Sequence, residues 1–139
     1  MKTIKWFLIT MILVATPLIS GCGTMKAYPG PELPKDKLAL IKDRGTFMHG
    51  VSVLKVDGEK TGFHGSAEVA PGDHTLEVRM QKFFLFWSET AYGVVQFTAE
   101  AGREYQVDAV MQVRFRNPTA WFWIDDVESG KVIGGRKPE

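Results

Sequence analysis

The sequence predicts an all-β fold, an antiparallel β-sandwich of about seven to eight strands. The clearest observation is residues 104–116, where apolar and polar side chains alternate with a period of two. That pattern is typical of a strand with one buried side. Glycine-containing turns separate this and similar segments at roughly ten-residue spacing, which favours an antiparallel sandwich. No long segment with a 3.6-residue apolar period follows the N-terminal region, so the pattern does not indicate a helical domain.

Seven segments carry the strand pattern. Residues 74–81 alternate as regularly as 104–116, and residues 91–100 do so less cleanly. The other predicted strands are 38–42, 51–56, 120–127 and 131–133. The turns between them place glycine where a positive φ is required. These turns are Asp57-Gly58, Pro71-Gly72-Asp73, Ala101-Gly102 and Ser129-Gly130.

The N-terminal residues have the organisation of a secretory signal peptide. Lys2 and Lys5 form a basic head, and residues 6–19 are almost wholly apolar. The run is shorter than the roughly 20 apolar residues of a membrane-spanning helix, and Thr10, Thr16 and Pro17 interrupt it. We therefore expect residues 1–21 to be a cleaved signal peptide.

The end of this leader, Ile19-Ser20-Gly21-Cys22, resembles the lipobox of bacterial lipoproteins. The resemblance implies a diacylglycerol thioether on Cys22, cleavage after Gly21 and usually a third acyl chain on the new amine. Two or three acyl chains anchor a protein stably, whereas one does so only marginally. In the sorting rule that accompanies this resemblance, Asp after the cysteine favours inner-membrane retention. Because that position is Gly23, we expect a lipid anchor in the outer membrane, with the protein facing the periplasm.

Composition bounds the remaining chain. Removing 21 of the 139 residues leaves 118, a normal size for one domain. The loss of Lys2 and Lys5 changes the formal charge from +1 to −1, so no basic excess favours nucleic acid as a partner. Cys22 is the only cysteine, which leaves none for a disulfide. The core must therefore stabilise the fold alone.

Residues 22–37 are predicted to be a proline-rich tether between the lipid and the domain. Pro29, Pro31 and Pro34 disfavour both helix and ladder pairing, and such segments tend to be extended. The alternative is that this segment packs along the domain. The expected β-sandwich then covers residues 38–134, and residues 135–139 form a short tail.

Two motifs resemble a PEGA-type module. Val56-Asp57-Gly58 is followed by Ala70-Pro71-Gly72-Asp73-His74-Thr75-Leu76-Glu77-Val78, similar to the family's "VDG" hairpin and Pro-Gly turn with the strand after it. The Pro-Gly-Asp-His version departs from the Pro-Glu-Gly-Ala consensus. The resemblance implies a non-catalytic immunoglobulin-like or prealbumin-like sandwich of an envelope protein. More broadly, residues 28–34, the Pro-Gly-Asp-His turn, residues 101–105 and residues 123–126 followed by Ser129-Gly130 resemble small uncharacterised proteobacterial lipoproteins.

Candidate catalytic and metal-binding residues are sparse. His74 opens a strand after a Pro-Gly turn, and the better interpretation is an imidazole that bridges the turn backbone to a neighbouring strand. His49 and His64 lack the short spacing of zinc ligands. Asp125 and Asp126 point to opposite faces of a strand, so they cannot converge on one substrate. We expect no catalytic residue, no metal site and no cofactor.

Two segments place large apolar side chains on both faces of a predicted strand. If the strand that starts at His74 continues past Gln81, Phe84 and Phe86 extend its buried face. The opposite face then carries Phe83, Leu85 and Trp87, and in the second segment Trp121 and Trp123 lie opposite Phe122 and Ile124. Three interpretations follow: core packing, a surface for a partner or ligand, or insertion at a membrane surface. The possible interaction surface comprises Phe83, Leu85, Trp87, Trp121 and Trp123.

The sequence thus predicts a non-enzymatic envelope lipoprotein. Acylated Cys22 binds it to membrane lipid, and the β-sandwich presents an interaction surface to another envelope protein. The alternative is a glycan- or small-ligand-binding module that uses Trp87, Trp121 or Trp123 as stacking platforms.

Overall fold

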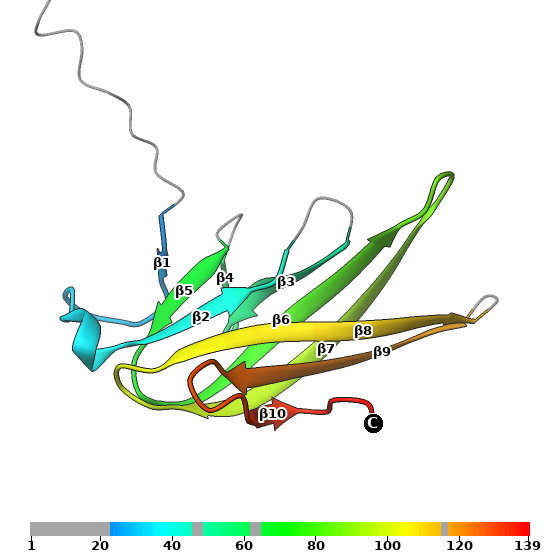
Figure 1. Ribbon diagram of the computed structural model, residues 1–139. Helices are drawn as coiled ribbons and strands as arrows, with labels where there is room; N and C mark the ends of the chain where they lie inside the picture. The colour runs from blue at the N-terminus through cyan, green and yellow to red at the C-terminus, as the bar shows by residue number, and fades with distance from the viewer. Residues whose placement is uncertain (1–22, 46–48, 62–64, 115–116) are drawn as a thin grey trace, which may run out of the picture.

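The computed structural model describes residues 23–45, 49–61, 65–114 and 117–139, and these residues form two packed β-sheets (Figure 1). Beside the strands there is one short 3-10 helix in the described residues, η1 (Lys35–Lys37). The strands are β1 (Met25–Lys26), β2 (Ala39–Asp43), β3 (His49–Val56), β4 (Glu59–Lys60), β5 (Ser66–Val69), β6 (Gly72–Phe83), β7 (Ser88–Ala99), β8 (Glu104–Arg114), β9 (Asn117–Asp126) and β10 (Val132–Gly135).

The prediction of an all-β sandwich is confirmed, with two corrections. One sheet has the order β1-β5-β2-β8-β9-β10 and the other β4-β3-β6-β7. The first sheet is not wholly antiparallel, because β1 pairs with β5 and β2 with β8 in parallel. A parallel pair needs a long crossover, and here the entire second sheet lies between β2 and β8 in the chain. The described residues contain ten strands rather than seven to eight, since β1, β4 and β5 are too short for a period-two pattern to reveal them.

The core lies between the inner faces of the long strands. Leu76, Val78 and Val95 of the four-stranded sheet face Val107 and Ile124 of the six-stranded one, and all five are fully buried. The predicted inward residues of 74–81, 91–100 and 104–116 therefore include the centre of the core. The last of these strands is observed up to Arg114, and residues 115–116 lie outside the described residues.

Strand β10 closes one side of the sandwich by packing against β7 of the other sheet. A Cβ atom on Gly134 would lie 2.3 Å from the carbonyl oxygen of Gln96, so only glycine permits this approach. Beyond the strand, Arg136 N–H donates to the carbonyl of Phe122 at 2.8 Å. Gly135 therefore belongs to the β10 ladder, so the expected tail of residues 135–139 does not begin as a separate segment.

Residues 25–28 of the expected tether pack on the domain, whereas residues 29–37, which include the prolines, are exposed. The expected spacer is therefore wrong for residues 25–28. Met25 and Lys26 pair with β5, and Ala27 N–H donates to Glu68 O at 2.8 Å. Tyr28 is buried, and its hydroxyl accepts a hydrogen bond from Leu33 N–H at 3.1 Å. The edge of β5 has backbone N–H and C=O groups that β1 can bind, and burial of the tyrosine ring removes apolar surface from water. The β-domain therefore includes β1 and does not begin at Leu38.

Several strand ends meet at one end of the sandwich, which we call the upper end. The ladder register aligns Met25 of β1 with Ala67, Ile41 and Tyr105, so β1 lies where β8 begins, whereas β6 and β8 both finish at the upper end. After β2 the chain turns into β3, where Val51 N–H donates to Arg44 O, and β6 runs antiparallel to β3 toward the upper end. The upper end therefore holds the β6–β7 turn, while β1 and the β9–β10 turn lie toward the opposite, lower end (Figure 1).

Candidate functional site: an apolar hairpin tip

The β6–β7 hairpin ends in an apolar tip formed by residues 83–87. Phe83 is the last residue of β6 and pairs with Ser88, the first residue of β7. Between them Phe84 N–H donates to the carbonyl of Trp87 at 2.8 Å, which closes the turn. The strand therefore stops before the alternation can continue, and the expectation that Phe84 and Phe86 extend the buried face is wrong.

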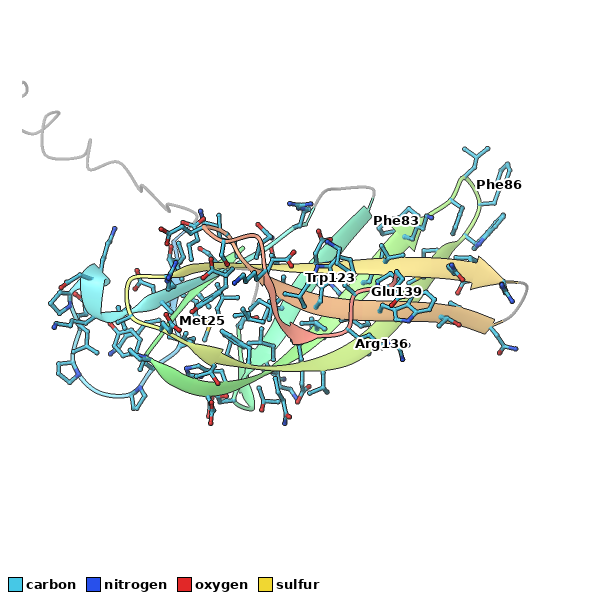
Figure 2. All side chains as sticks on the ribbon, turned by 60° about the horizontal axis from the view of Figure 1, so that its bottom comes forward. Met25, Phe83, Phe86, Trp123, Arg136 and Glu139 are labelled. Atoms are coloured by element: carbon cyan, nitrogen blue, oxygen red, sulfur yellow. The ribbon has the colours of Figure 1, made fainter. Side chains whose placement is uncertain are left out.

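Large apolar side chains of the tip are exposed to solvent. Leu85 is 87% exposed, Phe86 86% and Trp87 54%, and Phe83 is also exposed. Figure 2 shows Phe86 at the extreme end of the hairpin. A hydrophobic side chain that stays in water forgoes about 1.5–3 kcal/mol of burial energy. Several such residues at one point are unusual on a monomer, which makes the tip the candidate site.

The tip has an internal order of its own. The rings of Phe84 and Trp87 stack with centroids 5.0 Å apart and 22° between their planes. The ammonium of Lys82 lies 5.7 Å from the centroid of the Phe84 ring. The stack supports the turn from within, so Leu85 and Phe86 project beyond it.

The described part of the fold leaves this tip uncovered. Strand β3 covers one edge of β6 only as far as Lys82, which pairs with His49. The two long hairpins, β6–β7 and β8–β9, diverge toward their turns (Figure 1). Strand twist produces such divergence, because packed sheets can stay in contact only over a limited length. The apolar tip therefore extends past the core that buries the rest of β6 and β7.

Two further exposed apolar residues were not predicted. Tyr92 is 69% exposed and Val94 62%, and both lie on the outer face of β7. The signal was available, because alternation along 91–100 places both residues on the face that carries Gln96 and Thr98. An apolar residue on an otherwise polar face is the feature that would have identified them.

The tryptophans of β9 do not join the apolar tip. Trp121 and Trp123 lie on the outer face of the six-stranded sheet, opposite Val110 and Asp108. Trp121 is half-buried, whereas Trp123 is only 4% exposed, so the prediction that Trp123 contributes to an exposed surface is wrong. Figure 2 shows Trp123 in the body of the molecule, far along the ribbon from Phe86.

The burial of Trp123 has a clear cause. Its indole N–H donates to Asp125 Oδ2 at 2.9 Å, and the ammonium of Lys137 lies 5.4 Å from its ring centroid. On the ladder, Gly135 of β10 is its neighbour on one side and Asp108 of β8 on the other. The returning C-terminal residues therefore cover a ring that the β9 sequence alone would leave outside.

His74 acts as a structural bridge at the lower end, as predicted. Its Nδ1 lies 2.6 Å from Asp57 Oδ2 and its Nε2 lies 2.7 Å from the carbonyl oxygen of Ala70. Each ring nitrogen therefore has an oxygen partner within hydrogen-bond distance, and neither remains free for a metal or a substrate. The ring also packs 5.9 Å from Phe97. His74 thus joins the two motifs that carry the PEGA resemblance.

Asp57 is the second member of this bridge. Asp57 has φ of 51° and the next residue, Gly58, has φ of 86°, so both adopt the left-handed conformation of a tight hairpin turn. Its Oδ1 accepts a hydrogen bond from Thr75 N–H at 2.8 Å. Partial burial acts to raise the pKa of Asp57, but the Thr75 and His74 interactions outweigh it and hold this pKa below its ordinary value.

The other candidate carboxylates are also engaged in structure. Asp125 binds the indole of Trp123, and Asp126 ends β9 and accepts a hydrogen bond from Ser129 N–H at 2.7 Å. That bond lowers the pKa of Asp126 against the effect of burial, with Arg103 adding to it. The two carboxylates point to opposite faces, as expected, and begin the turn that leads to Gly130.

No group of three or more His, Cys, Asp or Glu side chains within the described ranges is arranged to hold a metal ion. Cys22 and His64 lie outside the described residues, as does the side chain of His49. The part of the chain that the structure describes contains no helix with the length and apolar character needed to cross a membrane.

Comparison with known proteins adds no relative. No protein-family model matches the chain, and neither a curated protein nor a solved structure matches it significantly. The residues themselves must therefore carry the functional argument.

Proposed function

We propose that this protein is a non-enzymatic lipoprotein of the bacterial envelope, anchored in the outer membrane through acylated Cys22. Its β-sandwich faces the periplasm and presents the apolar tip of the β6–β7 hairpin as an interaction surface. The single observation that supports an interaction role is the exposure of Leu85, Phe86 and Trp87 at one projecting point.

The anchoring part of the proposal rests on the leader. A basic head, a short apolar run and the residues Ile19-Ser20-Gly21-Cys22 occur in the order that lipoprotein processing requires. Two or three acyl chains then hold the protein on the membrane without any spanning segment.

The non-enzymatic part rests on the polar side chains. His74, Asp57, Asp125 and Asp126 each bind another group of the fold. His74 lines a pocket with Thr75 and Thr98, but its two ring nitrogens already contact Asp57 and the carbonyl of Ala70, and Thr98 donates to Asp73. The glycan alternative is less well supported than the interaction surface. Trp123 is buried, and one face of the Trp87 ring stacks on Phe84, so two of the three proposed platforms are compromised.

Replacement of the cysteine tests the anchor. Cys22→Ala in the native host should abolish incorporation of radioactive palmitate and leave an unprocessed precursor with its leader attached. The matched control is Ser20→Ala, which keeps a small residue at its lipobox position and should leave labelling unchanged. Continued labelling of Cys22→Ala would contradict the proposal.

A further inference from the structure

We propose that the free edge of strand β7, residues 88–94, pairs antiparallel with the same edge of a second copy of this chain. The two four-stranded sheets then form one continuous sheet across a twofold axis. This inference goes beyond the proposed function, because it names a partner for a surface beside the apolar tip and does not depend on acylation of Cys22.

Strand β7 is a long unpaired edge of the four-stranded sheet. It ends the order β4-β3-β6-β7, so within the described ranges it pairs with β6 alone. Strand β10 lies beside its lower part, where a Cβ on Gly134 would reach the carbonyl oxygen of Gln96, and Figure 1 shows β10 at that end of β7. Above that contact, the outer edge of residues 88–94 has no strand partner in the described chain.

The hydrogen-bond pattern shows which backbone groups lie on this edge. Phe84 N–H donates to the carbonyl of Trp87, so these two residues form a hydrogen-bonded pair at the end of the β6–β7 ladder. Hydrogen-bonded and non-hydrogen-bonded pairs alternate along an antiparallel ladder. The residues whose N–H and C=O groups point away from β6 are therefore Ser88, Thr90, Tyr92 and Val94. The carbonyl of Gln96, the next in this series, faces β10 in the same way.

This edge lacks the features that protect the other edge strands. Strands β1 and β4 have two residues each and β10 has four, whereas β7 has twelve. Strand β9, which continues past β10, contains Pro118. Natural proteins keep edge strands from pairing by shortness, proline or charge. From Thr90 to Ala99, β7 contains neither a proline nor a charged residue, so its upper part is a template for another strand.

A second copy fits this edge because the free stretch is complementary to itself. When the twofold axis passes beside Ala91, Thr90 lies opposite Tyr92 of the other copy, and Ser88 lies opposite Val94. This register pairs the whole free stretch and stops before the part of β7 that β10 approaches. Tyr92 and Val94, which are 69% and 62% exposed, then gain cross-strand neighbours on the outer face of the joined sheet.

Charge and apolar surface also favour a second copy in this register. Glu89 is the only charged residue of β7, and it lies opposite Gly93 of the other copy rather than opposite itself. Phe86 of the tip reaches the level of the other copy's Gln96, beside β10. Val132 of β10 is exposed, so the apolar tip meets apolar surface there. A second copy supplies both features by symmetry, as in other twofold dimers.

A disulfide trap tests the pairing and its register. Ala91 forms a non-hydrogen-bonded pair with its own copy, with Cα atoms about 4.5 Å apart, which is within the range of a disulfide. Ala91→Cys, expressed in the native host and oxidised in the membrane with copper phenanthroline, should convert at least half of the chain to a disulfide-linked dimer.

The matched control for the trap is Val94→Cys on the same strand. Val94 is well exposed, but its own copy lies six residues away along the ladder, or about 20 Å. Val94→Cys should therefore yield less than a tenth of the dimer that Ala91→Cys gives. Equal yields from both variants would overturn the proposal, because they would report random collision rather than this pairing.

Substitution of Tyr92 tests the backbone contribution. Its N–H points away from β6, so Tyr92→Pro removes a donor for the second copy without removing a bond of the β6–β7 ladder. Purified from membranes in detergent, the native protein should have a protein mass of two chains by light scattering, and Tyr92→Pro should show a twofold decrease. Tyr92→Phe keeps the donor and should stay dimeric.

A second variant covers the case in which proline disturbs the fold, which circular dichroism reports. Tyr92→Lys keeps every backbone group and adds the charge that protects natural edges, so it should show the same twofold decrease. The matched control is Gln96→Lys, which adds the same charge on the same face of β7 outside the paired stretch. A two-chain mass for a folded Tyr92→Lys would contradict the proposal.

The remaining outcomes separate this inference from the proposed function. A native protein with the mass of one chain overturns the pairing, and so does an Ala91→Cys adduct that contains a different protein. The native chain is the blank of the disulfide trap, because acylated Cys22 has no free thiol. A disulfide-linked dimer of the native chain contradicts the proposed anchor, and the mass in detergent then decides the edge pairing by itself.

Discussion

The apolar tip and the tryptophan segment of β9 look alike in sequence but differ in burial. Residues 83–87 and 121–124 both place bulky apolar side chains on successive positions, so neither has a polar face. Trp123 is 4% exposed, while Leu85 is 87% exposed. The difference arises because β10 and the C-terminal residues return beside β9, whereas no described segment returns beside the turn after β6.

This comparison teaches that a loss of alternation has two opposite meanings. In β9 it indicates a strand covered on both faces, by the core on one side and by residues such as Lys137 on the other. At the β6–β7 turn it indicates side chains outside the sheet altogether. Residue type alone cannot distinguish the two, because the covering group comes from a distant part of the chain.

Truncation of each tryptophan gives the largest expected contrast. Trp123→Ala should lower the free energy of unfolding by about 3–5 kcal/mol, the usual cost of removing a buried aromatic ring. Trp87→Ala should lower it by less than about 1 kcal/mol, since the ring is half exposed and contributes only its stack with Phe84. Chemical denaturation of both variants measures the contrast, and equal losses would show that the two segments are buried alike.

Removal of the cover from β9 is the second way to test the comparison. Gly135 has φ of 76°, and a Cβ there would lie 2.3 Å from the carbonyl oxygen of Phe122. Gly135→Ala should therefore destabilise the protein by about 2–4 kcal/mol through overpacking and left-handed strain, and shift the emission of Trp123 to the red.

The matched control for that change is Gly130→Ala. Gly130 has φ of 66° but no atom within 4 Å of its ideal Cβ, so only the strain, about 1 kcal/mol, remains. The same loss in both variants would mean that close packing of β10 does not protect Trp123.

Substitution of Asp57, in the bridge with His74 at the lower end, gives the smallest expected effect. Asp57→Asn should lower the free energy of unfolding by about 1 kcal/mol or less at neutral pH, because the side chain is half exposed and solvent screens its interactions. The pKa of Asp57 is lowered by folding, so the carboxylate stabilises the fold above its unfolded pKa, near 4. This contribution is lost as the pH falls through the lower folded pKa.

Urea denaturation at pH 7 and pH 3 checks the sign of the effect. The native protein and Asp57→Asn should differ at pH 7 and converge toward pH 3. Trp123→Ala, whose cost comes from packing, should keep its deficit at both values. A difference for Asp57→Asn that grows as the pH falls would contradict the assigned pKa direction.

Local features of the sequence predicted the long strands well. Residues 104–116 and 74–81 alternate clearly, and Val107, Leu76 and Val78 are fully buried where the pattern puts them. The role of His74 followed from its place after Pro71-Gly72, and both of its ring nitrogens are bound as expected. Short strands were missed, because two residues such as Met25 and Lys26 contain no period.

The candidate site was only partly predictable. Phe83, Leu85 and Trp87 are exposed at one tip, as the interaction-surface interpretation requires. Phe86 was assigned to the core because the strand was extended past its true end at Phe83. Trp121 and Trp123 were grouped with the tip although they lie on the other sheet, since a sequence does not state which residues face each other across a sandwich.

By itself the sequence determined the β class, the turns at Asp57-Gly58 and Ser129-Gly130, and the lipobox-like leader that ends at Cys22. These depend on backbone preferences and on side chains within a few residues of each other. Only the tertiary structure decided that β2 and β8 run parallel, that β1 joins the sheet, and that β10 covers Trp123. Each of these depends on ladder groups and apolar surface from distant segments, and their contact energy becomes available only when the whole chain has folded.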